Sequence, residues 1–246
     1  MASKRSQIST SEHERLTVDL EEARRLYDAG RYQEAEQICR ALLLEGGDRA
    51  EALHMLGRIM YRLGRLEMSE AMYRRALTFA PSSPDILLTL GQVLYSTAKV
   101  PEAVDVLEQA LDTSPDNVEA HAVLGAALQE LGRFEEAVHH CRLAVSLDLE
   151  HARSYFHLAN ALCTLGKVDE ARIAFSKALE LDRSYGDAHR RLALALVAVH
   201  RLDEARRLLQ AAAAIDPDAP EVEFALASLE GRAVERAPEK YISSYF

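Results

Sequence analysis

The side chains of this chain most able to bind a metal or act as nucleophiles are nine histidines and three cysteines. His139 and His140 are adjacent, so on a helix their side chains diverge and cannot share one metal. No two histidines show the four-residue spacing with acidic support that a helical zinc site requires. The cysteines have no paired spacing and are expected to be small core residues in a reducing cytoplasm: Cys39, Cys141 and Cys163. The residues therefore predict neither a metal site nor a cofactor.

The acidic residues follow a structural pattern rather than a catalytic one. Segments such as FEEA at 134–137 and VDEA at 168–171 place carboxylates early in expected helices, where the helix dipole favours them. The chain has no glycine-rich phosphate loop and no nucleophile elbow, and no strand-turn-helix context to hold either. We therefore expect no enzymatic activity from these residues.

Composition excludes several classes of partner. A net charge of −10 argues against a nucleic-acid binder, because phosphate contacts need an excess of lysine and arginine. No uninterrupted apolar stretch is long enough to span a membrane, and residues 1–14 lack the apolar core of a secretory signal. The composition predicts a cytoplasmic protein with no membrane insertion.

The elements that position these side chains repeat every 34 residues without an insertion or deletion. One small residue recurs in this frame at Ala35, Ser69, Ala103, Ala137, Ala171 and Ala205. A leucine recurs at Leu56, Leu90, Leu124, Leu158, Leu192 and Leu226, and it is followed each time by glycine or alanine. Such a period is typical of stacked repeats that bury their apolar faces only against their neighbours.

Each repeat is expected to be two antiparallel helices joined by a tight turn. In the unit from Val118 to Asp148, apolar and small residues fall three or four apart on both sides of Gly132. Glycine readily adopts the left-handed conformation that ends a helix, and Gly30, Gly64 and Gly166 share this turn position. Ala98 and His200 replace the glycine in the other two units.

These residues carry a resemblance to the tetratricopeptide repeat family. In the second unit the family pattern is matched by Leu53, Leu56, Gly57, Tyr73, Ala76 and Pro81. The resemblance implies an all-α fold, a right-handed superhelical solenoid of six helix-turn-helix repeats with a C-terminal capping helix. It places the repeats at 15–218, starting near residues 16, 50, 84, 118, 152 and 186, and the capping helix at 219–232. Residues 1–14 are expected to be disordered, and 233–246 to form a tail or a linker.

The resemblance also implies a function and a site. First helices line the concave groove in the family, so we expect a protein-protein interaction scaffold that binds an extended peptide there. Transferred by frame, the candidate groove residues are Arg58, Tyr61, Arg62, Gln92, Tyr95, Arg153, His157, Asn160, Arg190 and Arg191. They form two basic clusters on an acidic protein, and arginine forks suit carboxylates. The expected partner is therefore a protein or peptide with an acidic side chain or a C-terminal carboxylate. The alternative for these clusters is a set of solvated surface charges.

Two further alternatives stay open. Tyr241, Ile242, Tyr245 and Phe246 gather near the end of the chain, and the segment APEKYISSYF resembles the junction in bacterial fusions of this repeat to S-adenosylmethionine-dependent methyltransferases. The chain would then be the substrate-recruiting region of an enzyme whose catalytic domain lies beyond Phe246. Self-association is a third possibility, because solenoids stack end to end.

Overall fold

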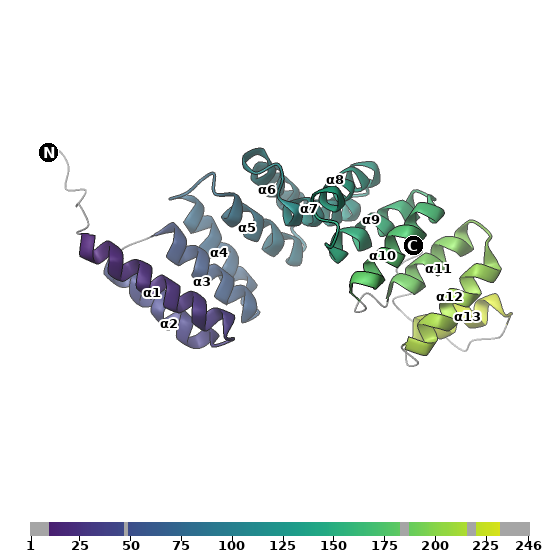
Figure 1. Ribbon diagram of the computed structural model, residues 1–246, viewed down its shortest axis with the longest axis horizontal. Coiled ribbons are helices and arrows are strands. Elements are labelled where there is room, and N and C mark those ends of the chain that lie inside the picture. Colours follow the sequence, from purple (N-terminus) through teal and green to yellow (C-terminus); the bar gives the residue numbers. More distant parts are fainter. Residues whose placement is uncertain (1–9, 47–48, 183–186, 216–219, 232–246) are drawn as a thin grey trace. The chain divides into compact units, whose positions relative to one another are not determined.

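The computed structural model describes residues 10–46, 49–182, 187–215 and 220–231 (Figure 1). Every regular element in these ranges is an α-helix, which confirms the all-α fold class. The helices form two compact units, Met1–Pro115 and Asp116–Phe246, here called unit 1 and unit 2. The expected tail at 233–246, with its aromatic cluster, lies outside the described residues.

Unit 1 contains three helical hairpins, α1/α2, α3/α4 and α5/α6. In addition, α2 packs on α3 and α4 packs on α5, and α3 contacts both α1 and α5, so the three first helices lie side by side. The bounds are α1 Thr10–Asp28, α2 Tyr32–Gly46, α3 Ala50–Arg62, α4 Leu66–Leu77, α5 Pro84–Ser96 and α6 Val100–Thr113.

The first helix of unit 1 begins before the expected start near Leu16. It starts at Thr10, and no glycine or proline interrupts the sequence from there to Asp28. Residues 10–14 are thus helical, where disorder was expected. For residues 1–9 the expectation stays a prediction, because they lie outside the described ranges.

Unit 2 contains three more hairpins and a final single helix. The first helices α7, α9 and α11 again lie side by side, and α13 packs on α12. The bounds are α7 Val118–Glu130, α8 Phe134–Leu147, α9 Ala152–Thr164, α10 Val168–Leu181, α11 Asp187–Ala198, α12 Leu202–Ile215 and α13 Pro220–Leu229. In α13, Val222 is buried as expected, while Leu226 and Leu229 are only partly buried.

The turn inside each hairpin requires one residue in the left-handed region. Gly64 has a φ of 72° and Gly132 one of 74°, as their sequence position predicts. Ala98 and His200 adopt the same conformation, with φ of 58° and 61°, although a Cβ atom disfavours it. The fold therefore imposes this conformation whichever residue occupies the turn.

The recurrent small residues lie where helices of one hairpin approach closely. Ala103 and Ala137 are fully buried. Ser69 occupies the equivalent position of the second hairpin, and its Oγ donates a hydrogen bond to the carbonyl oxygen of Gly57, at 2.8 Å. A Cβ atom on Gly91 would lie 2.6 Å from the side chain of Leu107, so only glycine fits without a shift.

The cysteines belong to this core rather than to a reactive site. Cys39 and Cys141 are fully buried, and Cys163 is partly buried. Burial raises the pKa of the Cys39 and Cys141 thiols to about 12, so both are protonated at neutral pH.

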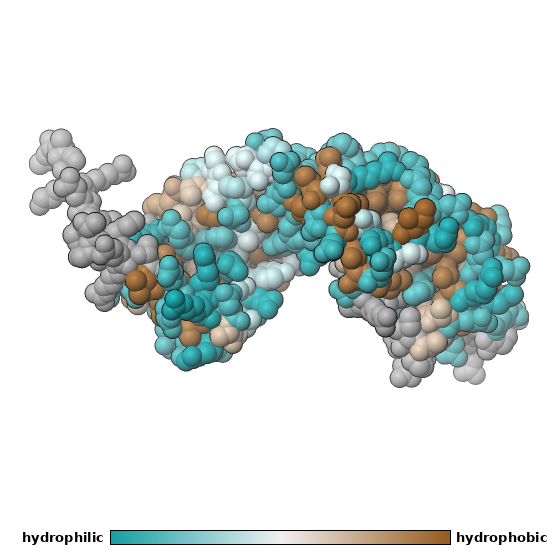
Figure 2. Space-filling model, in the orientation of Figure 1, coloured by the Kyte–Doolittle hydropathy of each residue, from teal (hydrophilic) through white to brown (hydrophobic). Residues whose placement is uncertain are grey.

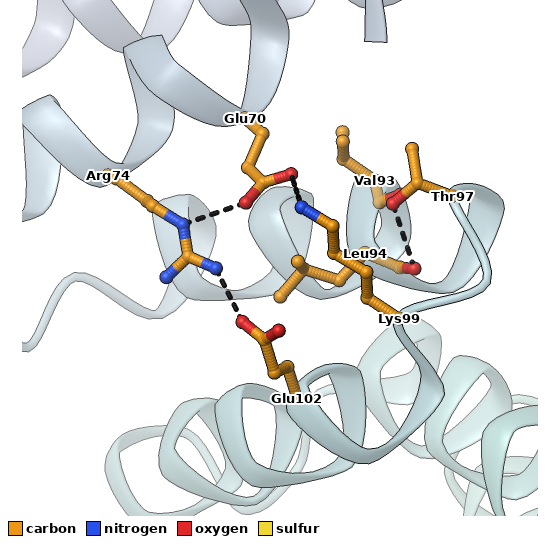
Figure 3. A network of polar contacts seen from close by, with 7 residues as sticks. All are labelled: Glu70, Arg74, Val93, Leu94, Thr97, Lys99 and Glu102. Atoms are coloured by element: carbon orange, nitrogen blue, oxygen red, sulfur yellow. Dashed lines mark hydrogen bonds and ion pairs between the residues drawn. The ribbon is translucent and has the colours of Figure 1, made fainter. Parts of the chain in front are cut away.

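Ion pairs join the second and third hairpins of unit 1 (Figure 3). Glu70 on α4 accepts from Arg74 Nε and Lys99 Nζ, both at 2.9 Å, and Arg74 Nη2 donates to Glu102 at 2.6 Å. Burial alone would raise the pKa of Glu70, but the bonds from Lys99 and Arg74 outweigh it, so its pKa lies below the ordinary value. These contacts tie α4 to α6 and to Lys99, which immediately precedes α6.

Candidate functional site

A pocket of about 790 Å³ opens along the first helices of unit 1. We call it the unit 1 groove. Four of the predicted site residues line it: Arg58, Tyr61, Arg62 and Gln92. Other lining residues include Glu21, Arg24, Tyr27, Glu51, His54, Tyr73, Asp85, Leu88 and Thr89. The predicted Tyr95 is absent from this lining and instead packs, partly buried, against the core around Tyr73 and Leu90.

Arg58 presents a cation in this groove. Its guanidinium carbon lies 4.6 Å from the centre of the Tyr27 ring, which is a cation-π contact. Arg58 is partly buried, and among the described residues no carboxylate lies within ion-pairing distance of it. Its fork is therefore held by a ring face while its hydrogen-bond donors stay available to a ligand.

Arg62 and Tyr61 extend the polar lining toward the C-terminal end of α3. Arg62 Nε donates to Tyr32 Oη at 3.2 Å, and its guanidinium lies 5.9 Å from the centre of that ring. Tyr61 Oη lies 3.4 Å from Ser96 Oγ on α5. Tyr61 is 38% exposed, so most of its ring is packed while its edge reaches the groove.

His54 lies between the acidic and the basic lining residues. Its Nε2 is 3.2 Å from Thr89 Oγ1, and its ring packs against Tyr73 with centres 5.6 Å apart. Thr89 Oγ1 already donates to backbone carbonyls, so His54 Nε2 is the donor in this pair. Burial, then the charge of Arg58, lowers the pKa of His54 to about 4, although Asp85 opposes the shift. His54 is therefore neutral at physiological pH.

The groove residues of unit 1 fall into rows across successive first helices. Residues 34 apart occupy equivalent places, and this gives one row of Arg24, Arg58 and Gln92. A second row holds Tyr27 and Tyr61, and it continues to Tyr95, which packs against the core instead of lining the groove. The sequence prediction omitted Arg24 and Tyr27, although they occupy the same repeat positions as Arg58 and Tyr61. The 34-residue period itself was the signal that could have found them.

In unit 2 one arginine of the predicted basic cluster is already paired with an acid. Arg153 Nη1 contacts Glu119 Oε1, and His151 Nε2 lies 3.1 Å from Glu119 Oε2. Glu119 is one repeat before Arg153, so opposite charges at one repeat position could have indicated the pair. Arg153 therefore meets an internal carboxylate that the sequence prediction did not assign to it.

The other predicted residues of unit 2 lie on α9 and α11. The guanidinium of Arg191 lies 5.6 Å from the centre of the Phe156 ring. Burial, and then the charges of Arg153 and Arg191, lower the pKa of His157 to about 4, so this histidine is neutral. Asn160 and Arg190 are partly buried on these helices.

Sequence reasoning missed one histidine pair. His121 Nδ1 on α7 and His140 Nδ1 on α8 are 2.9 Å apart, and their rings stack. The residues are 19 apart and follow no period, so no sequence signal joined them. Over the described part of the chain, no group of three or more histidine, cysteine or acidic side chains could hold a metal ion. None of the described helices is both long and apolar enough to cross a membrane.

Models of tetratricopeptide repeats match most of the chain. The model described as the TPR domain of cytochrome c-type biogenesis protein H matches residues 32–147. Two models described as tetratricopeptide repeat match residues 127–186 and 164–229. None of the curated proteins compared with the chain matches it.

Solved structures share the fold. PilF of Pseudomonas aeruginosa is 16% identical, with 88% of this chain and 98% of that chain covered and a TM-score of 0.77. YrrB, a TPR protein with an unusual peptide-binding site, is 24% identical, with 76% and 95% covered and a TM-score of 0.63. MamA from Desulfovibrio magneticus RS-1 is 24% identical, with 69% and 96% covered and a TM-score of 0.61. The helical hairpins within residues 32–229 are tetratricopeptide repeats.

Proposed function

We propose that this chain is a protein-interaction module that holds an extended segment of a partner protein in the unit 1 groove. The observation that carries the proposal is Arg58, which is stacked on Tyr27 and available to a ligand in a pocket of about 790 Å³. The tetratricopeptide fold supports it, as does the peptide-binding site of the structurally similar YrrB.

The chemistry of the lining suits such a ligand. Tyrosine and arginine are enriched among the residues that dominate binding energy in protein interfaces, because both give large contact area together with directed polar groups. Tyr61 and Arg62 offer a ring edge and a second guanidinium beside Arg58. Since His54 is neutral and hydrogen-bonded, we assign it a positioning role in the groove.

The residues predicted in unit 2 form a second, separate contact surface in this proposal. Asn160 offers an amide that suits a peptide backbone, with Arg190 and Arg191 on the neighbouring first helix. Arg153 would have to exchange Glu119 for a ligand carboxylate. Binding of an acidic side chain or a C-terminal carboxylate at Arg153 therefore competes with an internal partner.

A peptide selection tests the proposal. A phage-displayed library of random twelve-residue peptides is selected on the full chain, and the enriched peptides are titrated against Arg58→Ala with Tyr61→Ala. Loss of central arginine and tyrosine contacts should weaken binding by about tenfold or more. The matched control is Arg40→Ala with Phe79→Ala, which removes the same kinds of side chain from exposed sites of unit 1 outside the groove. Equal binding by the groove variant, or no enriched peptide, would contradict the proposal.

The methyltransferase alternative rests on a different segment. It depends on APEKYISSYF, which lies outside the described residues, and nothing in the described part of the chain favours it. The full open reading frame distinguishes the two functions.

A further inference from the structure

Charges of opposite sign are sorted along the unit 1 groove. Glu51 and Asp85 lie in the first turns of α3 and α5, whereas Arg58 lies two turns further along α3. Seven residues of helix separate Glu51 from Arg58, a rise of roughly 10 Å. His54 lies between them, and both Arg58 and Asp85 act on its pKa, in opposite directions. Along α3 the groove is thus acidic at the start of the helix and basic further along, and on α1 the acidic Glu21 also precedes the basic Arg24, by one turn.

These charges are available to a ligand. Among the described residues neither Glu51 nor Asp85 has a side-chain hydrogen bond or an ion pair, and both residues are exposed. The equivalent carboxylate of unit 2, Glu119, is occupied by Arg153 and His151. Acidic residues in a first turn also favour their own helix. Stabilising the start of a helix does not require Glu51 and Asp85 to line the same pocket as Arg58, as they do here.

We propose that the unit 1 groove selects an extended segment with one basic and one acidic side chain about three residues apart. The basic side chain would face Glu51 and Asp85, and the acidic side chain would face Arg58. This inference rests on the proposed function and adds the chemistry of the partner.

The spacing and the selectivity follow from simple geometry. An extended chain advances about 3.3 Å per residue, so three residues cover the roughly 10 Å between Glu51 and Arg58. A segment with two acidic residues would satisfy Arg58 but would place its second carboxylate against Glu51 and Asp85. Like charges brought together at an interface disfavour the wrong partner, which gives specificity beyond what Arg58 alone provides.

Capped synthetic octapeptides test the spacing. One series carries a lysine and an aspartate separated by two to five positions in both orders, in a fixed background of alanine with one tyrosine. Two control series carry two aspartates or two lysines instead. Fluorescence polarisation with the full chain should show the tightest binding at a separation of three. The margin over the two-aspartate peptides should be about tenfold and should shrink as salt is raised.

Charge reversal in the groove provides the sharper test. Glu51→Lys with Asp85→Lys replaces two carboxylates of the lining by two cations and leaves Glu21 as its acidic residue, so the preference should move to the two-aspartate peptides. The matched control is Glu108→Lys with Asp112→Lys, two exposed acidic residues of α6 outside the groove, which makes the same change in net charge. That control should keep the preference of the parent protein.

The outcomes separate this inference from the proposed function. If no peptide, including those from the random library, binds the parent protein through Arg58, the proposed function fails. If peptides bind through Arg58 but two-aspartate peptides bind as well as mixed ones, or the reversal changes nothing, only the charge-pair inference fails. Circular dichroism checks that the variants fold, and Glu51→Gln with Asp85→Asn repeats the test without adding charge. Loss of the preference for mixed charge in that variant is the expected result.

Discussion

The first helices α3 and α5 of unit 1 share a buried leucine with the first helices of unit 2 at one repeat position. They differ in residue type at other repeat positions. Leu56 and Leu90 in unit 1 correspond to Leu124, Leu158 and Leu192 in unit 2, and all of these are buried. The row that holds Tyr27, Tyr61 and Tyr95 in unit 1 holds Gln129, Cys163 and Val197 in unit 2. The repeat therefore constrains packing while it leaves the groove free to specialise, and only unit 1 has a row of tyrosines.

One arginine of each unit illustrates a second difference, although Arg191 of unit 2 also lies on a ring, that of Phe156. Arg58 of unit 1 rests on an aromatic ring, whereas Arg153 of unit 2 contacts a carboxylate. On the face shown in Figure 2, hydrophobic side chains gather over α8–α10. Both units have exposed large hydrophobic residues, such as Leu44 of unit 1 and Leu149 of unit 2. A charge held by an internal partner contributes to the fold, and a charge left on a ring face remains available for recognition.

The largest difference between the units should appear on acidification. Burial lowers the pKa of His140 and His157 in unit 2, and of His54 in unit 1, to about 4. Unfolded histidine binds a proton near pH 6.5, so between pH 6.5 and 4 the unfolded chain holds protons that the folded chain does not. Stability is therefore complete above pH 6.5 and falls as the pH drops, by about 2 kcal/mol per histidine at pH 5.

Unit 2 has two histidines with a lowered pKa, His140 and His157, and unit 1 has one, His54. As the pH falls, the amides of unit 2 should therefore lose protection from hydrogen exchange first. Hydrogen exchange followed peptide by peptide at pH 7 and pH 5 measures this directly. His157→Gln should remove part of the pH dependence of unit 2 and leave that of unit 1 intact. An equal loss in both units would contradict the assignment of these histidines.

Overpacking should affect each unit separately. Ala103→Leu in unit 1 and Ala137→Leu in unit 2 introduce a large side chain at fully buried positions and should each cost roughly 1–3 kcal/mol. In an array of nearest neighbours, exchange should rise first in the hairpin that carries the change. Ala71→Leu, at an exposed position of α4, should leave the melting temperature close to that of the parent. If Ala137→Leu melts like the parent protein, the repeat frame is wrong.

A smaller effect should come from the turns, with one site in each unit. Ala98→Gly and His200→Gly relieve a left-handed conformation that a Cβ atom disfavours, and each should stabilise its unit by about 1 kcal/mol. Gly64→Ala is the reverse change at an equivalent turn, where an added Cβ meets nothing within 4 Å. It should destabilise by a similar amount through the backbone alone. Thermal melts of the three variants decide this, and stabilisation by Gly64→Ala would contradict it.

The sequence predicted the helices and the turns because both follow the period. Ala98 and His200 could be assigned to the turn from their position alone, against their own conformational preference. The groove was only partly predictable, because period and helix geometry place a side chain on a face but do not choose its contact. The stacking of Arg58 on Tyr27 depends on a rotamer that packing selects. The His121–His140 pair depends on two helices meeting at residues with no shared register.

The smallest effect on stability, and the most direct test of the contrast between the units, concerns Glu119. The sequence analysis placed Arg153 among the groove residues expected to face a ligand carboxylate. In the structure Glu119 already meets that arginine, so we expect Arg153→Ala with Asn160→Ala to reduce acidic peptide binding only slightly. Glu119→Gln should instead release Arg153, and loss of an exposed pair should change stability by less than about 1 kcal/mol.

Binding measured in an Arg58→Ala background isolates unit 2 from the unit 1 groove. There, a capped peptide with two aspartates should bind more tightly after Glu119→Gln, because its carboxylate no longer competes with an internal one. Adding Arg153→Ala should cancel the gain. If Glu119→Gln leaves the affinity unchanged, then Arg153 is not a latent recognition site. The difference between the units would then come from the placement of the arginines and not from what neutralises them.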